Sequence, residues 1–406
     1  MSLTLRIFLA LIAGLVVGAL MPASLGAPLL PITDAIGNLW LQALQMTIIP
    51  LIAGLLFTGI AQSVGQAGGG KVAGRALLAF LLLLIFSALW SMFFVPLLLD
   101  WWPAPAEAAA QIVASSKGSV GGDIKIDVGK WLLSLVPANV FDALAKGDML
   151  PVVTFVAVFA LAATRLADEP RLRLVGLFDA VKDAMLILVG WIFVAAPVGV
   201  FALAVSVGIK AGLGAFGLLG HYIAVLVSVQ VGLIILVYPL AVILGRVGPI
   251  EFARAALPAQ AVAVSTQSSI ASLPAIYDGA ERLGLPEATT RVVLPLAVSI
   301  FRITSPCANI AVVLYCGHLY GMDHTALAYL GGLLAALVAA VSTGGLPGSI
   351  TFLAACVPIA NAMGVPIGVL PVLLAVELVP DVFRTLGNVT ADLAVTSILS
   401  RNRARS

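Results

Sequence analysis

The sequence ELVPDVFRTLGNVTAD, residues 377–392, places four ionisable side chains inside an otherwise apolar segment. Four polar side chains recur there at steps of four, three and four residues, namely Asp381, Thr385, Asn388 and Asp392. This spacing puts them on one face of an α-helix, and Arg384 lies on an adjoining part of that face. A charge at the centre of a membrane helix costs about 2.5–3.5 kcal/mol on insertion scales, so the stripe predicts a functional site.

The composition indicates a membrane protein. Of 406 residues, 61% are hydrophobic and only 10% are charged, whereas a soluble domain carries roughly a quarter charged residues. The net charge of +2, without a basic stripe, excludes a nucleic-acid partner. The sequence contains no paired-histidine motif and no nucleophile beside a base, so we do not expect an enzyme. We expect an all-α polytopic membrane protein.

Long apolar runs predict the spans. A spanning helix needs about 20 apolar residues. We expect eight spans, near residues 3–21, 35–62, 76–99, 131–164, 175–208, 214–245, 288–319 and 367–399. Two further apolar stretches, 252–281 and 326–363, are interrupted by Ser, Thr, Gly and Pro, and we interpret them as re-entrant helical hairpins. The loops rich in Lys and Arg then fall on one side, which predicts an inner (plasma) membrane protein with both termini cytoplasmic.

The last 150 or so residues repeat themselves in the same order. The four matches are AVST at 263–266 and 340–343, Ser-Ile at 269–270 and 349–350, Gly-x-Pro at 284–286 and 364–366, and Phe-Arg at 301–302 and 383–384. With eight spans, the two copies enter the membrane from opposite sides. Secondary transporters commonly use such inverted repeats, with the substrate between them near the bilayer midplane.

Five ionisable residues lie inside the predicted spans: Arg302, Glu377, Asp381, Arg384 and Asp392. An Arg fork matches a carboxylate, and a carboxylate one turn away accepts hydrogen bonds from an ammonium group. The pair Asp381 and Arg384 therefore favours an acidic amino acid as ligand. Glu377 has a structural interpretation instead, as the partner of an ion pair.

At this stripe the sequence resembles the last-helix signature of the dicarboxylate/amino acid:cation symporters, the glutamate transporter family. Supporting resemblances are QMTIIP at 45–50 with GIA at 59–61, APVGVFAL at 196–203, SS at 268–269 with LP at 273–274, and GLPG at 345–348. The resemblance covers essentially the whole chain. It implies eight helices and two inverted hairpins, a homotrimer in lipid, and a peripheral transport domain that slides as an elevator against a central scaffold.

The resemblance also implies roles for single residues. Arg384 would bind the side-chain carboxylate of the substrate and Asp381 its amino group. The further substrate ligands would be Thr385, Asn388, Ser268, Ser269, Gly345 and Pro347, joined in this sequence by Arg302. The ligands of the coupling cation would be Asp392, Asn388, Ser299 and Thr343. The second hairpin would be the extracellular gate.

The same resemblance divides the chain into domains. Residues 1–68 would hold scaffold helices 1 and 2, and residues 101–210 would hold scaffold helices 4 and 5. Residues 69–100 would form helix 3 of the transport domain, and residues 211–406 the rest of it. Its hairpins would lie near residues 251–282 and 326–363.

One sodium site departs from the family pattern. The family's Asn-Met-Asp-Gly-Thr break in the seventh helix aligns with FRITS at 301–305, so that Phe301 and Ile303 replace a ligating Asn and Asp. In the third helix Leu83 and Phe86 replace a Tyr and a Thr, and only Ser87 remains. Apolar side chains offer no oxygen donors, so we predict that this sodium site is lost.

Arg302 falls where the family has an uncharged residue, and three interpretations stay open. Its guanidinium replaces a bound cation, or it contacts a second carboxylate of the substrate, or it snorkels or pairs with Glu377 or Asp392.

The predicted function is symport of a small acidic substrate, aspartate or glutamate first, coupled to Na⁺ or H⁺ with fewer Na⁺ sites than the family pattern. The alternatives are a C4-dicarboxylate symporter and an anion-conducting, channel-like member of the same fold.

Overall fold

The structure is a computed structural model that describes residues 3–67, 71–115, 136–146, 149–212, 214–342 and 348–400. Within these ranges the regular structure is entirely α-helical. The helices of the first half are α1 (Leu3–Leu20), α2 (Ala23–Ala67), α3 (Lys71–Trp101), α4 (Ala106–Ser115), α6 (Val140–Lys146), α7 (Met149–Ala163), α8 (Asp168–Val194) and α9 (Ala196–Ala211). Those of the second half are α10 (Gly214–Gly245), α11 (Pro249–Thr266), α12 (Ser269–Arg282), α13 (Glu287–Ile300), α14 (Thr304–Leu319), α15 (Ala326–Ser342), α16 (Gly348–Met363), α17 (Leu370–Leu374) and α18 (Leu378–Ser400).

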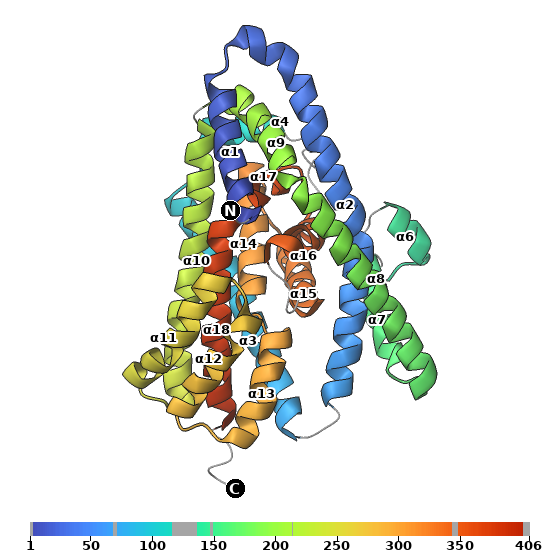
Figure 1. Cartoon of the computed structure of the whole chain (residues 1–406), viewed down its shortest axis with the longest axis vertical. Coiled ribbons are helices and arrows are strands. Elements are labelled where there is room, and N and C mark those ends of the chain that lie inside the picture. The colour runs from blue at the N-terminus through green and yellow to red at the C-terminus, as the bar shows by residue number, and fades with distance from the viewer. Residues whose placement is uncertain are drawn as a thin grey trace.

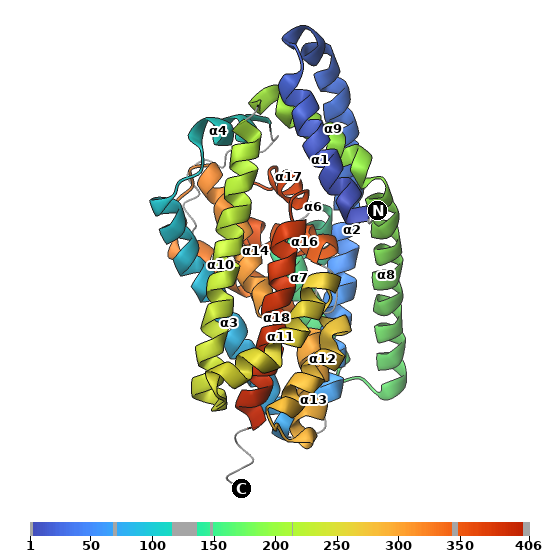
Figure 2. The ribbon, with the colours of Figure 1, turned by 60° about the vertical axis from the view of Figure 1, so that its left-hand side comes forward.

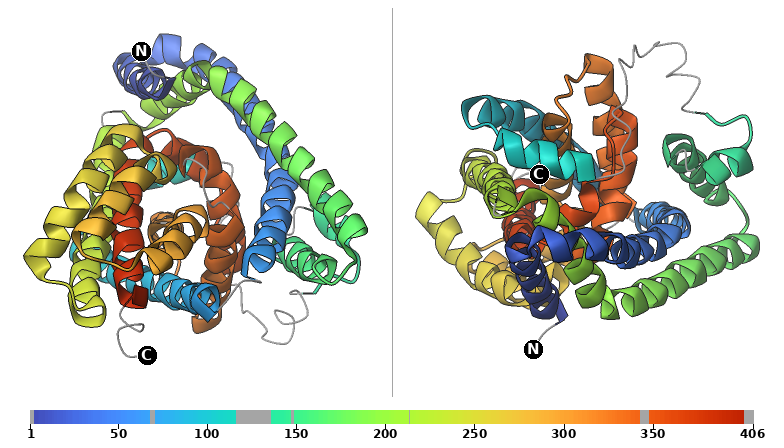
Figure 3. Two further views of the ribbon diagram at one scale, coloured as in Figure 1. Left: turned by 60° about the horizontal axis from the view of Figure 1, so that its bottom comes forward. Right: turned by 90° about the horizontal axis from the view of Figure 1, so that it is seen from above.

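The helices pack in two groups. In the first group α1 lies along α9, and α2 packs against α8 and α9, along the top and the right-hand side of Figure 1. In the second group α10 packs along α18, α11 packs against α12 and α18, and α3 packs against α14. Figure 2 shows the two groups on opposite sides, and the left view of Figure 3 shows α2 running beside α8. The early helix α3 thus joins helices from the far end of the chain.

Glycines allow the close approach of α1 and α9. A Cβ on Gly18 of α1 would lie 2.3 Å from the carbonyl oxygen of Val205, and a Cβ on Gly208 of α9 would lie 2.6 Å from that of Leu15. Small residues let membrane helices pack backbone against backbone, where dispersion contacts are densest. This seam fixes the first helix on the ninth.

The bend between α8 and α9 also follows from the sequence. The two helices meet at an angle of 56°. Pro197 lies in the first turn of α9, where its ring cannot follow a preceding helical turn and its missing N–H removes one bond from the ladder. The predicted span at 175–208 is therefore two helices rather than one.

Among the described residues, three helical units are long and apolar enough to cross a membrane: Gly74–Trp101, Phe216–Gly245 and Glu287–Leu319. The bent pair of α8 and α9 is a fourth. These units coincide with four predicted spans. The spans predicted at 3–21 and 35–62 fall on α1 and α2. The span predicted at 131–164 lies partly outside the described residues. The span predicted at 367–399 is divided between α17 and α18. The total of eight spans stays a prediction.

Both predicted hairpins correspond to pairs of packed helices, α11 with α12 and α15 with α16. Each pair is followed by the same backbone turn. Gly284 and Gly364 have φ of +65° and +72°, and the amide of the next residue donates to the carbonyl five residues before it, at 3.0 and 2.8 Å. This is the Schellman cap, whose left-handed residue favours glycine. The sequence repeat is therefore also a structural repeat at this turn.

We predict that Gly18→Ala destabilises the protein, because the new Cβ would overlap the backbone of α9. Overpacking of this kind costs about 1–3 kcal/mol. The matched control is Gly190→Ala in α8, where a Cβ meets nothing within 4 Å and helix propensity improves by up to about 1 kcal/mol. Thermal unfolding in detergent should show a lower midpoint for the first variant and an unchanged or higher midpoint for the second. Equal midpoints would contradict the tight seam.

Candidate functional site

The predicted polar residues gather around a break between α13 and α14. α13 ends at Ile300, the backbone of Phe301 is extended (φ −98°, ψ 101°), and α14 begins at Thr304. Arg302 lies in this break. Non-helical backbone at membrane depth needs hydrogen-bond partners from surrounding protein, because no water is available there.

Helix α18 supplies those partners. The Thr304 amide donates to Asn388 Oδ1 at 3.1 Å. The Thr304 hydroxyl lies 2.8 Å from the same oxygen and 2.9 Å from the carbonyl oxygen of Arg384, so its single proton serves one of the two at a time. A Cβ on the neighbouring Gly387 would lie 2.4 Å from Thr304 Cγ2, so glycine is what lets the break approach α18 this closely. The stripe and the break form one unit.

Arg384 is held by two side chains. Its Nη1 donates to Asn309 Oδ1 at 2.7 Å, and its Nη2 lies 2.7 Å from Glu377 Oε1 in an ion pair in which both side chains are buried. Tyr222 Oη donates to the other oxygen of Glu377 at 3.4 Å. The structural interpretation of Glu377 as the partner of an ion pair is thus confirmed by its geometry, with Arg384 as that partner.

Arg302 is itself buried and acts on the stripe through its charge. The carboxylates of Asp381 and Asp392 attract its guanidinium, and the guanidinium of Arg384 repels it. Asp392 has no exposed surface, and the charge of Arg302 opposes the burial that disfavours its ionised form. The break thus provides a cation whose charge acts on two acidic side chains of α18.

Several buried polar atoms of the stripe have no hydrogen-bond partner in this structure. They include the donors Arg384 Nε and Asn388 Nδ2 and, as acceptors, both oxygens of Asp392. Because the Thr304 amide is a donor, the oxygen of Asn388 must face it, which leaves Nδ2 available to an acceptor. The available donor of Asn388, its Nδ2, suits an anion. In this geometry the side chain of Asn388 is therefore not a cation ligand.

Apolar side chains occupy the break between α13 and α14, where the sequence predicts that a sodium site is lost. Phe301 stacks on Phe80 of α3, with ring centroids 4.7 Å apart and planes inclined by 12°. Both rings and the side chain of Ile303 are buried. The Ser87 hydroxyl donates to the carbonyl of Leu84 in its own helix. The oxygen donors that a sodium ion needs are not offered by these side chains.

The turn of the first hairpin lies between α11 and α12. Gln267 adopts the left-handed conformation (φ 51°), and the Ser268 hydroxyl caps α12 by accepting from the Ala271 amide at 3.3 Å. Gln260 of α11 donates to the Thr390 hydroxyl of α18 at 2.8 Å and so ties the hairpin to the stripe. Ser268 and Ser269 are half-buried at this turn, and the hydrogen bond that the Ser268 hydroxyl accepts lies within the hairpin.

The other predicted residues lie elsewhere. The Thr385 hydroxyl donates to the Asp381 carbonyl in its own helix at 3.1 Å. Ser299 is exposed, and its hydroxyl donates to the Pro295 carbonyl at 2.6 Å, so it does not face the stripe's unpartnered oxygens in this structure. Three predicted residues of the second hairpin, Thr343, Gly345 and Pro347, lie outside the described residues.

Sequence reasoning missed four residues that position the stripe: Thr304, Asn309, Tyr222 and Gln260. Asn309 is the most informative, because it is a fully polar side chain in the apolar run PCANIAVVLY, residues 306–315. A buried amide there requires a partner, and that signal could have identified it. The pairing of Tyr222 and Gln260 with residues more than one hundred positions away could not be read from any local pattern.

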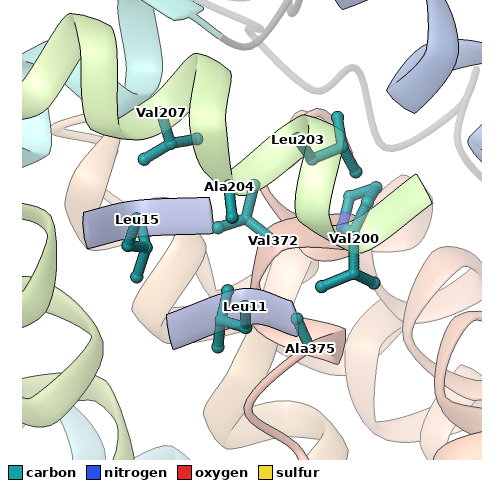
Figure 4. Close-up of a pocket in the computed structure, with 9 residues that line it drawn as sticks. Leu11, Leu15, Val200, Leu203, Ala204, Val207, Val372 and Ala375 are labelled. Atoms are coloured by element: carbon teal, nitrogen blue, oxygen red, sulfur yellow. The ribbon is translucent and has the colours of Figure 1, made fainter. Parts of the chain in front are cut away.

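A separate apolar cavity lies between α1, α9 and α17. Figure 4 shows Leu11 and Leu15 facing Val200 and Ala204, with Val372 and Ala375 beside them. Its lining offers no charged or hydrogen-bonding side chain, so it does not suit an anion or a cation. Among the described residues no group of three or more His, Cys, Asp and Glu side chains is placed to hold a metal ion.

Comparison with known proteins identifies the family of this chain. The model of the sodium:dicarboxylate symporter family matches residues 3–402. The chain is 26% identical to the proton/sodium-glutamate symport protein of Bacillus subtilis (strain 168), over 98% of the chain and 92% of that relative. It is 25% identical to the C4-dicarboxylate transport protein of the same organism, over 99% and 93%. It is also 25% identical to the proton/glutamate-aspartate symporter of Escherichia coli (strain K12), over 90% and 84%. Since the family model covers nearly the whole length, the chain belongs to the sodium:dicarboxylate symporter family.

Proposed function

We propose that this protein is a secondary active transporter that carries a small acidic substrate across the membrane together with a cation, Na⁺ or H⁺. Aspartate or glutamate is the leading substrate. The relatives with similar sequences are symporters of glutamate and transporters of C4-dicarboxylates, which supports an acidic substrate and cation coupling. The transport step needs no organic cofactor and no catalytic residue.

One observation carries this proposal: unpartnered donors and unpartnered acceptors lie on the same buried stripe. Arg384 Nε and Asn388 Nδ2 need an acceptor, and the oxygens of Asp392 need a cation or a donor. Leaving a buried polar group without a partner costs about 1–3 kcal/mol, and more when the group is charged. An anion together with a cation satisfies both kinds of atom at once, which neither ligand does alone.

The geometry of Arg384 supports its role in binding the substrate. Asn309 and Glu377 engage its two terminal nitrogens, and its Nε has no hydrogen-bond partner. The guanidinium is therefore held in place before the substrate arrives, which lowers the entropy that binding must overcome. Asp381, one turn earlier on the helix, is the proposed ligand of the substrate's ammonium group, with Thr385, Ser268 and Ser269 completing the pocket.

A C4-dicarboxylate is the second candidate substrate. The observation that favours it is the second buried guanidinium, Arg302, whose charge acts on the same stripe. Two guanidinium groups suit two carboxylates, and Asp381 would then have no ammonium to bind. The similarity to a C4-dicarboxylate transport protein agrees with this candidate.

The two packing groups suggest how the substrate moves. We assign α1, α2, α8 and α9 to a scaffold in a homotrimer, and α3 with α10 to α18 to a mobile transport domain in the plasma membrane, with cytoplasmic termini. At the cavity of Figure 4 the groups meet through apolar side chains alone. Sliding one group past the other there breaks no hydrogen bond, which supports an elevator mechanism with the second hairpin as the gate.

The substrate class can be tested with the purified chain in proteoliposomes. We expect uptake of aspartate or glutamate that is driven by an inward Na⁺ or H⁺ gradient and abolished by Arg384→Met, because the substrate carboxylate loses its partner. Asp381→Asn should lower amino acid uptake at least tenfold and leave malate or succinate uptake unaffected. Glu287→Gln, which changes an exposed ion pair, is the matched control. Unimpaired aspartate uptake by the Arg384 variant would contradict the proposal.

A double-mutant cycle tests the ion pair that holds Arg384. Glu377→Gln alone should destabilise the protein by about 3–5 kcal/mol, because it leaves a buried charge with one partner fewer. Combining it with Arg384→Met should cost much less than the two changes summed, with a coupling of about 1 kcal/mol or more in thermal unfolding. The exposed pair Glu287 and Arg291 serves as control and should show a coupling of about 0–0.5 kcal/mol. Additive effects at the buried pair would contradict the network.

A further inference from the structure

We propose that the guanidinium of Arg302 is a fixed cation of the transport site, which stays with the break between α13 and α14 and takes the place of one coupling cation. The protein then moves its acidic substrate with one cation fewer than it would need if Arg302 were neutral. This inference rests on the proposed function and concerns its stoichiometry.

The first argument is position. Arg302 lies in the break between α13 and α14, where its neighbours on both sides, Phe301 and Ile303, are buried and apolar. Phe301 is occupied by its stack on Phe80. Of the three residues that form the break, Arg302 is therefore the one with a polar side chain, and that side chain is a cation instead of a ligand for one.

The second argument is the set of charges that face Arg302. Asp381 and Asp392 attract its guanidinium, and Arg384 repels it. Glu377 is engaged by Arg384, so these two cancel each other. The oxygens of Asp392 accept no hydrogen bond in this structure, and the attracting charge that acts on this carboxylate is that of Arg302. A carboxylate with no exposed surface is otherwise neutralised by a bound cation or by a proton.

The third argument is the charge that must cross the membrane. With the pair of Glu377 and Arg384 neutral, two carboxylates against one guanidinium leave the stripe with a single negative charge. Without Arg302 the stripe would carry one negative charge more. Since an uncompensated charge is costly inside a bilayer, each negative charge of the loaded site calls for a cation that travels with it. Arg302 supplies one of these cations permanently and needs no ion gradient to do so.

The experiment measures the number of cations moved with each substrate molecule. The full chain is reconstituted in proteoliposomes, and the membrane potential at which radiolabelled aspartate, or succinate, shows no net flux is determined under set Na⁺ and pH gradients. We expect Arg302→Met to raise the cation count by one and Arg302→Lys to keep the wild-type count. The double variant Arg302→Met with Asp392→Asn removes one charge of each sign and should return to the wild-type count. Arg291→Met, an exposed change on α13, is the control.

A binding measurement covers variants that do not transport. In thermal unfolding of the purified protein without substrate, Arg302→Met should be stabilised by Na⁺ or by lower pH more steeply than the wild type, because an additional cation binds the folded state. The stabilisation, plotted against the logarithm of the cation concentration, should have a slope that corresponds to about one more bound cation than in the wild type. An unchanged cation dependence in both assays would overturn the inference.

The outcomes also separate this inference from the proposed function. If Arg302→Met loses affinity for succinate and keeps the wild-type cation count, Arg302 is a substrate ligand and the inference is wrong. If the wild type transports none of aspartate, glutamate, malate and succinate, the proposed function fails. The cation dependence of unfolding without substrate still decides the role of Arg302 in that case.

Discussion

The contact between Thr304 and Asn388 is the constraint on which the site depends. It satisfies the backbone amide that the break before α14 leaves without a helical partner, and it uses a side chain of α18 to do so. A broken helix in a membrane is stable only when such a partner exists. Because the partner lies on the polar stripe, the stripe and the break keep a fixed relation, and Arg302 is brought to the carboxylates of α18.

The buried charges form two units of different character. Glu377, Arg384 and Asn309 make a closed network in which each charge has a direct partner. Asp381, Asp392 and Arg302 make an open one, in which the oxygens of Asp392 have no hydrogen-bond partner. A closed network gives a rigid frame, and an open one gives capacity for ligands. A transport site needs both, since a substrate must bind in a defined pose and also leave.

The sequence predicted the helical class, the polar stripe and the repeat, because each of these rests on a local pattern, whereas the break at residue 301 followed from the resemblance to the family. The stripe follows from helical spacing, and the repeat's Gly-x-Pro turns became the equivalent caps at Gly284 and Gly364. The contact between Arg384 and Asn309 could not be predicted, because packing brings Asn309 to it from a segment 75 residues away. The direction of the Ser299 hydroxyl was likewise beyond prediction, since its own helix offers a carbonyl acceptor that the sequence does not distinguish from a bound ion.

The stack of Phe80 on Phe301 has a consequence for how the third helix is held. Where two helices share an ion, their association depends on the salt around the protein and weakens when the ion departs. Here the contact between α3 and the break is aromatic, so it is insensitive to ionic strength and persists through every stage at which the site is empty. The early helix α3 is therefore joined to the late helices by an aromatic contact that does not depend on a bound ion.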